Sequence, residues 1–251
     1  MLFKVNEFKI SLLAIFYFCL SCEVAFLVLD LCVNWLQWSS AKPIRRLFNI
    51  AREDSLPSLF AVLQSAMIAL LCWIIYIIHS RCLIPCMGNS FGWLLVALLF
   101  TYLTIDDGAL VHERIGTVFK YANSEITLPS YGWQIILAPV FALMGLLLFC
   151  FLWFKGGKYI HKGLLIAALT CLGSAVVIDY FEGTTWAYKS LSGQIGYSKF
   201  LISHFSKATE EFLEMLGMTF FLILFLRYFI MLTEQIEMRI RNGVVEFLDS
   251  K

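Results

Sequence analysis

The sequence predicts an all-α membrane protein: a polytopic bundle of about six transmembrane helices that forms a single domain over residues 1–251. The chain is 60% hydrophobic and only 15% charged, whereas a typical soluble domain is about a quarter charged. Its apolar runs come close to the roughly 20 residues that a helix needs to cross a bilayer. A net charge of +1 gives no long-range field to attract nucleic acid. The lipid bilayer is therefore an expected partner, and nucleic acid is not.

Six apolar segments make up the predicted bundle, at about residues 10–38, 58–79, 91–111, 133–154, 163–181 and 212–232. The first follows Lys4 and Lys9, as a signal peptide does, but its apolar run continues through Leu29 and favours a retained helix. Ser55 and Pro57, which precede the second segment, are typical of a helix start.

The remaining segments also have recognisable boundaries. The third begins after Ser90, and the fourth is followed by Gly156 and Gly157, which favour a turn. The fifth ends near Asp179, and the sixth begins close to Glu211. These boundaries predict one helical bundle without internal repeats.

An even number of spans places both termini on the same face of the membrane. Lys and Arg do not decide the direction of insertion, because ten lie on the face of the termini and nine on the other. The short basic connection from Lys155 to Lys162, together with the basic tail, favours the cytoplasm for both termini.

The acidic residues near the spans belong to one membrane face, whichever way the protein is inserted. They lie in the later part of the first span, at the ends of the third and fifth, and at the start of the sixth: Glu23, Asp30, Asp106, Asp107, Glu113, Asp179, Glu182, Glu210, Glu211 and Glu214. His112 and His204 belong to the same face. We therefore expect carboxylates and imidazoles from several helices to meet there.

Helix lengths place part of this cluster within the membrane. Residues 91–105 rise only about 22 Å, less than the roughly 30 Å hydrocarbon core, so Asp106 and Asp107 lie in the membrane or at its headgroup boundary. Glu214 is drawn in by the same argument, because only about 12 residues separate it from Arg227. An ionised carboxylate at a helix centre costs about 2.5–3.5 kcal/mol. A bound cation, shared protons, or pairing with Arg52, Arg114 and Lys207 would offset that cost.

These residue types favour a divalent metal. Carboxylates and imidazole together suit zinc, iron or manganese, and a metal removes the repulsion among the carboxylates. The predicted metal ligands are Asp106, His112, Glu113 and Glu214. The predicted catalytic groups, one of them a general base, are Asp107, Glu210 and Glu211. Further candidates are His204, Asp179, Glu182, Glu23 and Asp30. For Glu210 and Glu211 the alternative explanation is the dipole of a helix that begins there.

The sharpest local pattern lies between Asp106 and Glu113. If one helix runs through this segment, the two acids are seven residues apart and project from the same side. Gly108 can instead loosen or end the helix there.

Three segments carry a resemblance to a protein family. Residues 52–57 read R-E-D-S-L-P, residues 106–113 read D-D-x4-H-E, and residues 210–217 read E-E-x-L-E-M-x-G. This order, over about residues 50–230, resembles an uncharacterised family of bacterial polytopic membrane proteins with D-[DE]-x4-H-E and E-E-x-L-E-M-x-G motifs. Asp107 stands where that family usually has Glu. The resemblance implies a bacterial inner membrane and joint action of these polar groups, and it implies no particular reaction.

The favoured function is a membrane-embedded, metal-dependent enzyme whose lipid-like substrate enters from the bilayer. A proton- or cation-coupled transporter or channel is the first alternative, although a path across the membrane would need polar groups in both halves. The second alternative is a membrane assembly subunit whose acidic face docks a membrane partner or another copy of the chain. The sequence leaves the choice between enzyme and transporter open, and with it the substrate, the metal and the oligomeric state.

Overall fold

The computed structural model describes residues 11–81, 90–122, 130–184, 190, 192–194, 196 and 198–241. Within these ranges every regular element is a helix, which confirms the predicted all-α class. Residue 10, the predicted start of the first span, lies just outside the described residues.

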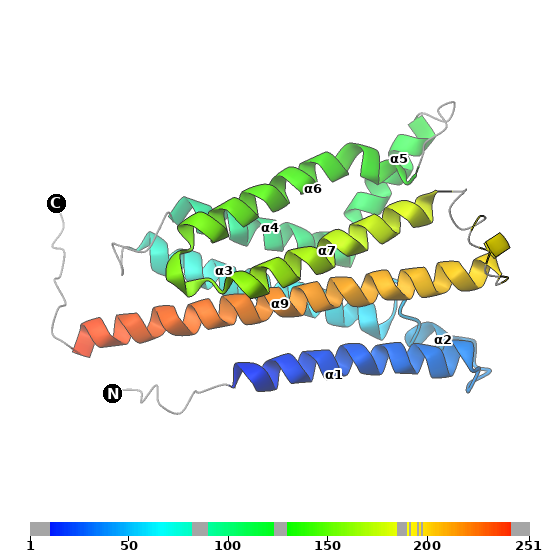
Figure 1. Cartoon of the computed structure of the whole chain (residues 1–251), viewed down its shortest axis with the longest axis horizontal. Coiled ribbons are helices and arrows are strands. Elements are labelled where there is room, and N and C mark those ends of the chain that lie inside the picture. Colours follow the sequence, from blue (N-terminus) through cyan, green and yellow to red (C-terminus); the bar gives the residue numbers. More distant parts are fainter. Residues whose placement is uncertain are drawn as a thin grey trace.

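The helices follow one another as α1 (Leu12–Asp30), η2 (Leu31–Trp35), α2 (Lys42–Leu47), α3 (Leu56–Ser80), α4 (Ser90–Ala109), α5 (Val111–Ala122), α6 (Gly132–Cys150), η3 (Phe151–Lys155), η4 (Gly157–Tyr159), α7 (Lys162–Gly183) and α9 (Lys199–Arg241). Six stretches of the described chain are long and apolar enough to cross a membrane: Leu12–Trp35, Leu56–Ser80, Ser90–Ala109, Gly132–Lys155, Lys162–Gly183 and Phe200–Glu234. The predicted six spans are thus confirmed by length and composition. In Figure 1 these long helices run back and forth along the long axis of the molecule.

Local side-chain contacts explain where the first helices begin. Ser11 and Ser55 each accept a hydrogen bond, at 3.3 Å, from the backbone N–H three residues later. Pro57 lies in the first turn of α3, where its missing N–H would have no helical partner in any case. The boundary that Ser55 and Pro57 predict is therefore present.

The last helix differs most from its prediction. α9 begins at Lys199 and extends over 43 residues, whereas the predicted sixth span begins at residue 212. Glu210 and Glu211 lie about three turns inside the helix, and the helix dipole acts only within the first turn. The explanation of these two acids by a helix N-terminus is therefore wrong. Polar residues between 199 and 211 lower the hydropathy of this part of the helix, so hydropathy alone does not predict it.

A sharp break separates α4 from α5. Leu110 has a φ of 53°, a left-handed conformation that a bulky side chain rarely adopts, and α5 starts at the next residue. Gly108 stays inside α4, so the glycine does not end the helix. Asp106 stabilises the break, because its Oδ1 accepts a hydrogen bond at 2.8 Å from the backbone N–H of His112 in the first turn of α5. The break thus brings His112 back to Asp106.

Aromatic side chains from α4 and α9 pack against one another in the core. Trp93, Phe100, Phe221, Phe225 and Tyr228 are each at most 1% exposed. The ring centroids lie 5.2 Å apart for Phe100 and Phe221 and 4.6 Å apart for Trp93 and Tyr228, within the usual range of aromatic pairs. α3 packs against both helices, so α3, α4 and α9 form the tightly packed part of the bundle.

α6 lies at one edge of the bundle in Figure 1 and packs mainly against α5. Two glycines let these helices touch at the backbone. A Cβ on Gly116 would lie 2.5 Å from the backbone N of Trp133, and a Cβ on Gly132 would lie 2.6 Å from the carbonyl O of Gly116. Any larger residue at either position would force the helices apart. This contact holds the start of α6 beside α5.

Candidate functional site

A cavity of about 1340 Å³ lies among α3, α4, α5, α6, α7 and α9. Nine of the described side chains that line it are carboxylic acids: Glu53, Asp106, Asp107, Glu113, Asp179, Glu182, Glu210, Glu211 and Glu214. The same described lining contains two lysines, Lys120 and Lys207, and one histidine, His112. The structure therefore brings acids from several helices together, with a large excess of negative charge.

Glu23 lies apart from this cavity, buried between α1, α3 and α9. Its Oε1 accepts hydrogen bonds from Thr219 Oγ1 at 2.5 Å and from Gln64 Nε2 at 3.1 Å. Gln64 also donates to Thr219 at 2.8 Å, and all three residues are fully buried. Glu23 thus belongs to a separate polar network deep in the bundle.

Asp30 and His204 form another separate pair, which links α1 to α9. Asp30 Oδ2 lies 2.8 Å from His204 Nε2, and its Oδ1 accepts a hydrogen bond from Asn34 Nδ2 at 2.9 Å. Neither Asp30 nor His204 is among the residues that line the cavity. Both of these further candidates are therefore already engaged in joining two helices.

Asp106 and His112, both predicted ligands, contact each other directly. Asp106 Oδ2 lies 2.8 Å from His112 Nδ1, while Oδ1 accepts from the backbone N–H of the same residue. Burial lowers the pKa of His112, but the hydrogen bond and charge of Asp106 outweigh it and raise the pKa above its usual value. The ring of Trp133 packs against the imidazole, with centroids 4.9 Å apart. The imidazole is thus held in one orientation at the cavity wall.

Lys207 supplies a positive charge inside the acidic cavity. Its Nζ lies 2.8 Å from Glu210 Oε1 and 3.4 Å from Glu211 Oε1. These contacts follow from spacings of three and four residues on one face of α9. Of the other two predicted cationic partners, Arg52 binds Asp54, and Arg114 Nε donates to a backbone carbonyl at 2.8 Å.

Asp179, Glu182 and Glu210, here called the acidic triad, form a compact group. Each offers one carboxylate oxygen, and these atoms all lie within 4.8 Å of one another. Across the described ranges this is the set of His, Cys, Asp or Glu side chains with the spacing of metal ligands. The four ligands predicted from the sequence do not form such a set there: Asp106, His112, Glu113 and Glu214. Asp107, Glu113, Glu211 and Glu214 line the same cavity around the triad.

Each acid of the triad has one oxygen held by a donor from the protein. Asp179 Oδ2 accepts from Gln134 Nε2 at 2.8 Å, and Glu182 Oε1 accepts from Ser203 Oγ at 3.0 Å. Glu210 Oε1 accepts from the Lys207 ammonium. The carboxylates therefore come from two helices, α7 and α9, and are fixed by donors on α6 and α9.

The second oxygens of Glu182 and Glu210 have no hydrogen-bond partner within the described part of the protein. Both atoms are buried, and the Glu210 residue is only 3% exposed. A buried carboxylate oxygen without a partner is costly, and most such groups in proteins are paired. A proton or a bound cation would remove that cost.

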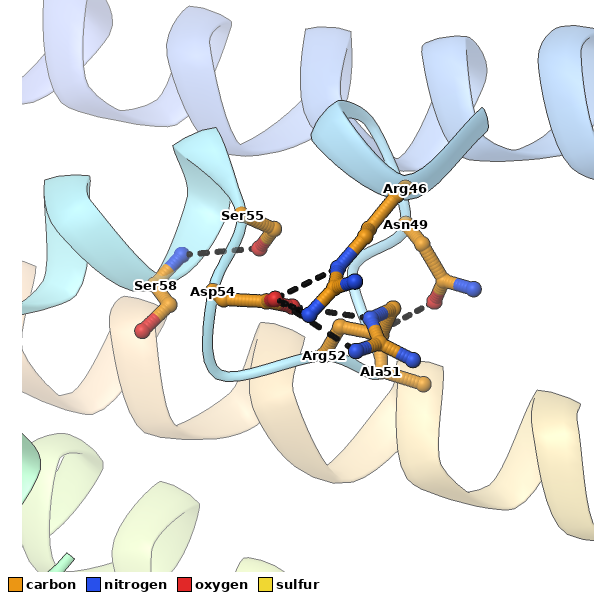
Figure 2. Close-up of polar contacts among 7 residues, drawn as sticks. All are labelled: Arg46, Asn49, Ala51, Arg52, Asp54, Ser55 and Ser58. Carbon is orange, nitrogen blue, oxygen red and sulfur yellow. Dashed lines mark hydrogen bonds and ion pairs between the residues drawn. The ribbon is translucent and has the colours of Figure 1, made fainter. Parts of the chain in front are cut away.

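The loop before α3 places two neighbouring acids in opposite surroundings. Asp54 faces outward and receives the guanidinium groups of Arg52 and Arg46, as Figure 2 shows. The hydrogen bond from Arg52, followed by that from Arg46, lowers the pKa of Asp54. Glu53 is exposed to the cavity, where protein on several sides replaces bulk water; this desolvation and the charge of Glu211 raise its pKa to about 7. The other charged groups that act on Glu53 are Lys207, Glu113 and His112.

Two aromatic residues at the start of α6 belong to this site and escaped the sequence analysis. Trp133 is 9% exposed and contacts His112, although a Trp near the end of a span usually indicates an interface anchor. Tyr131 lines the cavity, where burial and the carboxylate of Glu182 raise its pKa to about 12. The close approach of Gly116 and Gly132 places both, and no pattern within residues 130–135 signals it.

Fold and site together define a polytopic α-helical membrane protein with an acidic cavity between its helices. The chain belongs to the family described as a domain of unknown function (DUF8692), which matches residues 13–228. The predicted membership of an uncharacterised family is confirmed at that level, and the match spans every candidate site residue. No curated protein and no solved structure matches the chain.

Proposed function

We propose that the protein is a membrane-embedded enzyme that uses a divalent metal bound at the acidic triad and acts on a lipid-like substrate. The observation that carries this proposal is the unpartnered Oε2 of Glu210, an atom buried within a group of three carboxylates. With Lys207 ionised, the triad and its lysine carry a formal charge of −3 + 1 = −2. One divalent cation would make the group neutral.

The contacts around the triad support this proposal. Donors from Gln134, Ser203 and Lys207 each fix one carboxylate oxygen and leave another able to bind a cation. Partners of this kind orient metal ligands and tune their basicity in known metal sites. Acids that lie near one another on a protein surface by chance would not be buried, and their oxygens would not each be held by a donor from the protein.

The ligand atoms bear on which metal binds. Carboxylate oxygens alone favour manganese, magnesium or calcium, whereas zinc and iron usually take an imidazole as well. Manganese is therefore the best fit among the three predicted metals. Zinc or iron would require His112, which lines the same cavity.

The Asp106–His112 pair supports an acid–base role beside the metal. A carboxylate that fixes Nδ1 of an imidazole sets its tautomer and leaves Nε2 to give or take a proton. The metal would supply Lewis acidity or an activated water, and His112 would move the proton. Asp107 and Glu211, predicted as catalytic groups, remain alternatives on the same cavity wall.

Metal analysis of the purified full chain tests the proposal. We expect about one equivalent of Mn²⁺ to bind in detergent and to raise the melting temperature, because a ligand that binds only the folded state stabilises it. Glu210→Gln and Asp179→Asn should each weaken Mn²⁺ binding by roughly tenfold or more, as expected for the loss of one charged ligand.

Glu234→Gln is the matched control, because Glu234 is an exposed acid near the other end of α9. It should bind Mn²⁺ as the wild type does. Glu214→Gln and His112→Gln separate the triad from the ligand set predicted by sequence. Undiminished binding in Glu210→Gln, with loss in Glu214→Gln and His112→Gln, would replace the triad by that set, and no binding in the wild type would remove the metal altogether.

A proton- or cation-coupled carrier is the second candidate, and one observation favours it. Glu23, Gln64 and Thr219 form a fully buried polar network, away from the acidic cavity, such as an ion path would use. Metal-independent ion flux in liposomes that is lost in Glu23→Gln, with the triad variants unaffected, would favour this function over the enzyme.

We also propose the bacterial inner membrane as the location, with both termini in the cytoplasm and residues 1–251 acting as one domain. The basic connection from Lys155 to Lys162 supports this orientation through the positive-inside rule. A reporter active only in the cytoplasm, fused to the C-terminus, should be active, and an inactive fusion would reverse the orientation.

A further inference from the structure

We infer that the apolar part of the cavity, between α6 and α7, holds a hydrocarbon chain of a membrane lipid whose head group lies at the acidic triad. The head-group end rests on the proposed function. The chain-binding end rests on the shape and lining of the cavity, and it can be tested without any metal.

The cavity has two chemically different parts. Its acids gather at the end formed by α5, the start of α6 and the end of α7. The lining also contains Ala142 and Gly145 of α6 and Leu169, Gly173 and Val176 of α7, and these five residues are here called the apolar arm. All five lie within segments that are long and apolar enough to span the membrane.

α6 and α7 are connected at both ends of the apolar arm, and between these ends the two helices are separated. At the acidic end, Ser130 Oγ donates to the carbonyl O of Tyr180 at 2.8 Å, and Gln134 Nε2 donates to Asp179 at the same distance. At the other end, the π-helical segment η3 continues α6, and the short helix η4 connects it to the start of α7 along the chain. The helices are thus fixed around an opening, and they do not close over it.

Glycines mark the open middle of the apolar arm. A Cβ built on Gly145 or on Gly173 meets no atom within 4 Å, whereas a Cβ on Gly116, Gly132 or Gly183 would collide with a neighbour. The first two glycines therefore do not serve close helix packing. Side chains added there would project into open space, and both glycines line the cavity.

The size and setting of the whole cavity fit a lipid with its chain in the apolar arm. The lining of α6 runs from Gly132 to Leu148, about 24 Å along the helix, whereas one leaflet of the hydrocarbon core is about 15 Å deep. The cavity also exceeds the roughly 300–1,000 Å³ of pockets for small soluble ligands. The cavity is only partly enclosed, and Val176, which lines it within a membrane-spanning segment, is 43% exposed. A lipid can therefore enter sideways, with its chain in the apolar arm and its head group at the acids.

Photocrosslinking of the full chain tests this inference. The protein is reconstituted in vesicles of phosphatidylethanolamine and phosphatidylglycerol that carry a phospholipid with a photoreactive group at the end of one acyl chain. We expect crosslinks on peptides of α6 and α7 that include the apolar arm. Gly145→Trp and, from the opposite wall, Gly173→Trp should each lower their yield by roughly tenfold, the change expected when an indole displaces about two methylene groups.

Leu147→Trp is the matched control, because Leu147 lies two residues from Gly145, is 55% exposed and does not line the cavity. Its crosslinks should equal those of the wild type. Equal loss in Leu147→Trp, or no loss in either glycine variant, overturns the inference by indicating lipid bound only to the outer surface. Mn²⁺ binding is measured on the same samples. Retained Mn²⁺ binding in Gly145→Trp, together with lost crosslinks, supports the site for the lipid chain. Absence of Mn²⁺ binding in the wild type would contradict the metal site and leave the site for the lipid chain unaffected. If Gly145→Trp does not fold, Gly173→Trp decides.

Discussion

The two halves of this bundle differ in how their helices meet, although α9 belongs to both. In the packed half, α3, α4 and α9 interlock through aromatic rings, and Trp93 and Phe225 are buried against each other with centroids 5.9 Å apart. In the open half, α6 and α7 form the outer walls of a cavity of about 1340 Å³ that α3, α4, α5 and α9 also line, with carboxylates at one end.

The difference shows how one fold separates stability from a binding site. Apolar rings can pack without water, so they hold the helices in place wherever they meet. Carboxylates need a cation, a proton or a donor for each oxygen, and they cannot close upon one another. The open half therefore depends on specific polar partners, and changes to them should have effects unlike those of changes in the packed half.

The largest effect is expected from Lys207→Met, in the open half. Removing this cation leaves two carboxylates without their partner, and breaking a buried ion pair typically costs about 3–5 kcal/mol. Unfolding in a mild detergent with increasing denaturant measures this loss. Lys155→Met, at an exposed lysine, should change little. Added Mn²⁺ should recover more stability in Lys207→Met than in the wild type, and a stable Lys207→Met protein without metal would contradict the paired state of the acids.

Phe225→Ala should produce the next largest loss, in the packed half. Phe225 is fully buried and contacts Trp93, Phe100 and Phe221. The loss should be about 2 kcal/mol, because a cavity of about 100 Å³ costs about 24 cal/mol per Å³ and the transfer of apolar groups adds little in a bilayer. Phe154→Ala, at a ring that is 70% exposed, serves as the control for the same stability measurement. Similar losses in both variants would mean that α4 and α9 do not form the stable half.

Tyr228→Phe should have a smaller effect and tests a polar contact in the packed half, between α3 and α9. The Tyr228 hydroxyl lies 2.9 Å from Nε2 of His79, and both residues are buried. Leaving the imidazole unpaired should cost about 1 kcal/mol. Tyr17→Phe, at a residue that is 59% exposed, should be neutral in the same assay. A loss as large as that of Phe225→Ala would show that this half also depends on polar partners.

The smallest effect concerns Glu53 at the mouth of the open half and appears as a pH dependence. Its pKa is about 7 in the folded protein against 4.5 as the ordinary value, so the folded state keeps a proton that the unfolded state releases in that window. The contribution of Glu53 to wild-type stability therefore falls as pH rises from 4.5 to 7. Glu53→Gln lacks this penalty. The difference in melting temperature between Glu53→Gln and the wild type should therefore grow in favour of the variant from pH 4.5 to 7 and stay constant at higher pH.

Asp54→Asn gives the control of opposite sign, because Arg52 and Arg46 lower the pKa of this neighbouring carboxyl. The stability that Asp54 adds is present above its ordinary pKa and is lost as pH falls through the lowered value. Asp54→Asn should therefore be less stable than the wild type at neutral pH, and the difference should shrink in acid. A gain for Asp54→Asn, or a constant offset for Glu53→Gln, would contradict the opposite surroundings of these two acids.

Much of the fold could be predicted because the ability of a segment to span the membrane depends on the hydropathy of its own residues. The six spans and the boundary at Ser55 and Pro57 follow from residues that are close in the sequence. Two local features escaped the sequence analysis. The polar stretch from 199 to 211 hid the first turns of α9, and the break between α4 and α5 falls at Leu110, whose positive φ no residue preference indicates.

For the candidate site, the sequence predicted which residues lie in the same region of the bundle, but not which of them contact one another. Asp106 and His112 are six residues apart in the sequence and are in contact in the structure. They form a hydrogen bond with each other, and they do not belong to the compact group with metal-ligand spacing. Gln134 and Asp179 are 45 residues apart, and their contact depends on how α6 lies against α7. The compact triad of Asp179, Glu182 and Glu210 therefore emerged from residues named only as further candidates or as a catalytic group.

The sequence by itself determined that the chain is an apolar helical bundle, and it predicted one end of the bundle for most of its acids, since span number and span length set the expected depth of each residue. Tertiary structure alone decided which carboxylates touch, which are paired with Lys207 or His112, and where the helices stay apart. The physical reason is that depth follows from position along one helix, whereas contact depends on the rotation and spacing of several helices. Those are set by distant pairs such as Gly116 and Gly132, whose importance no local pattern records.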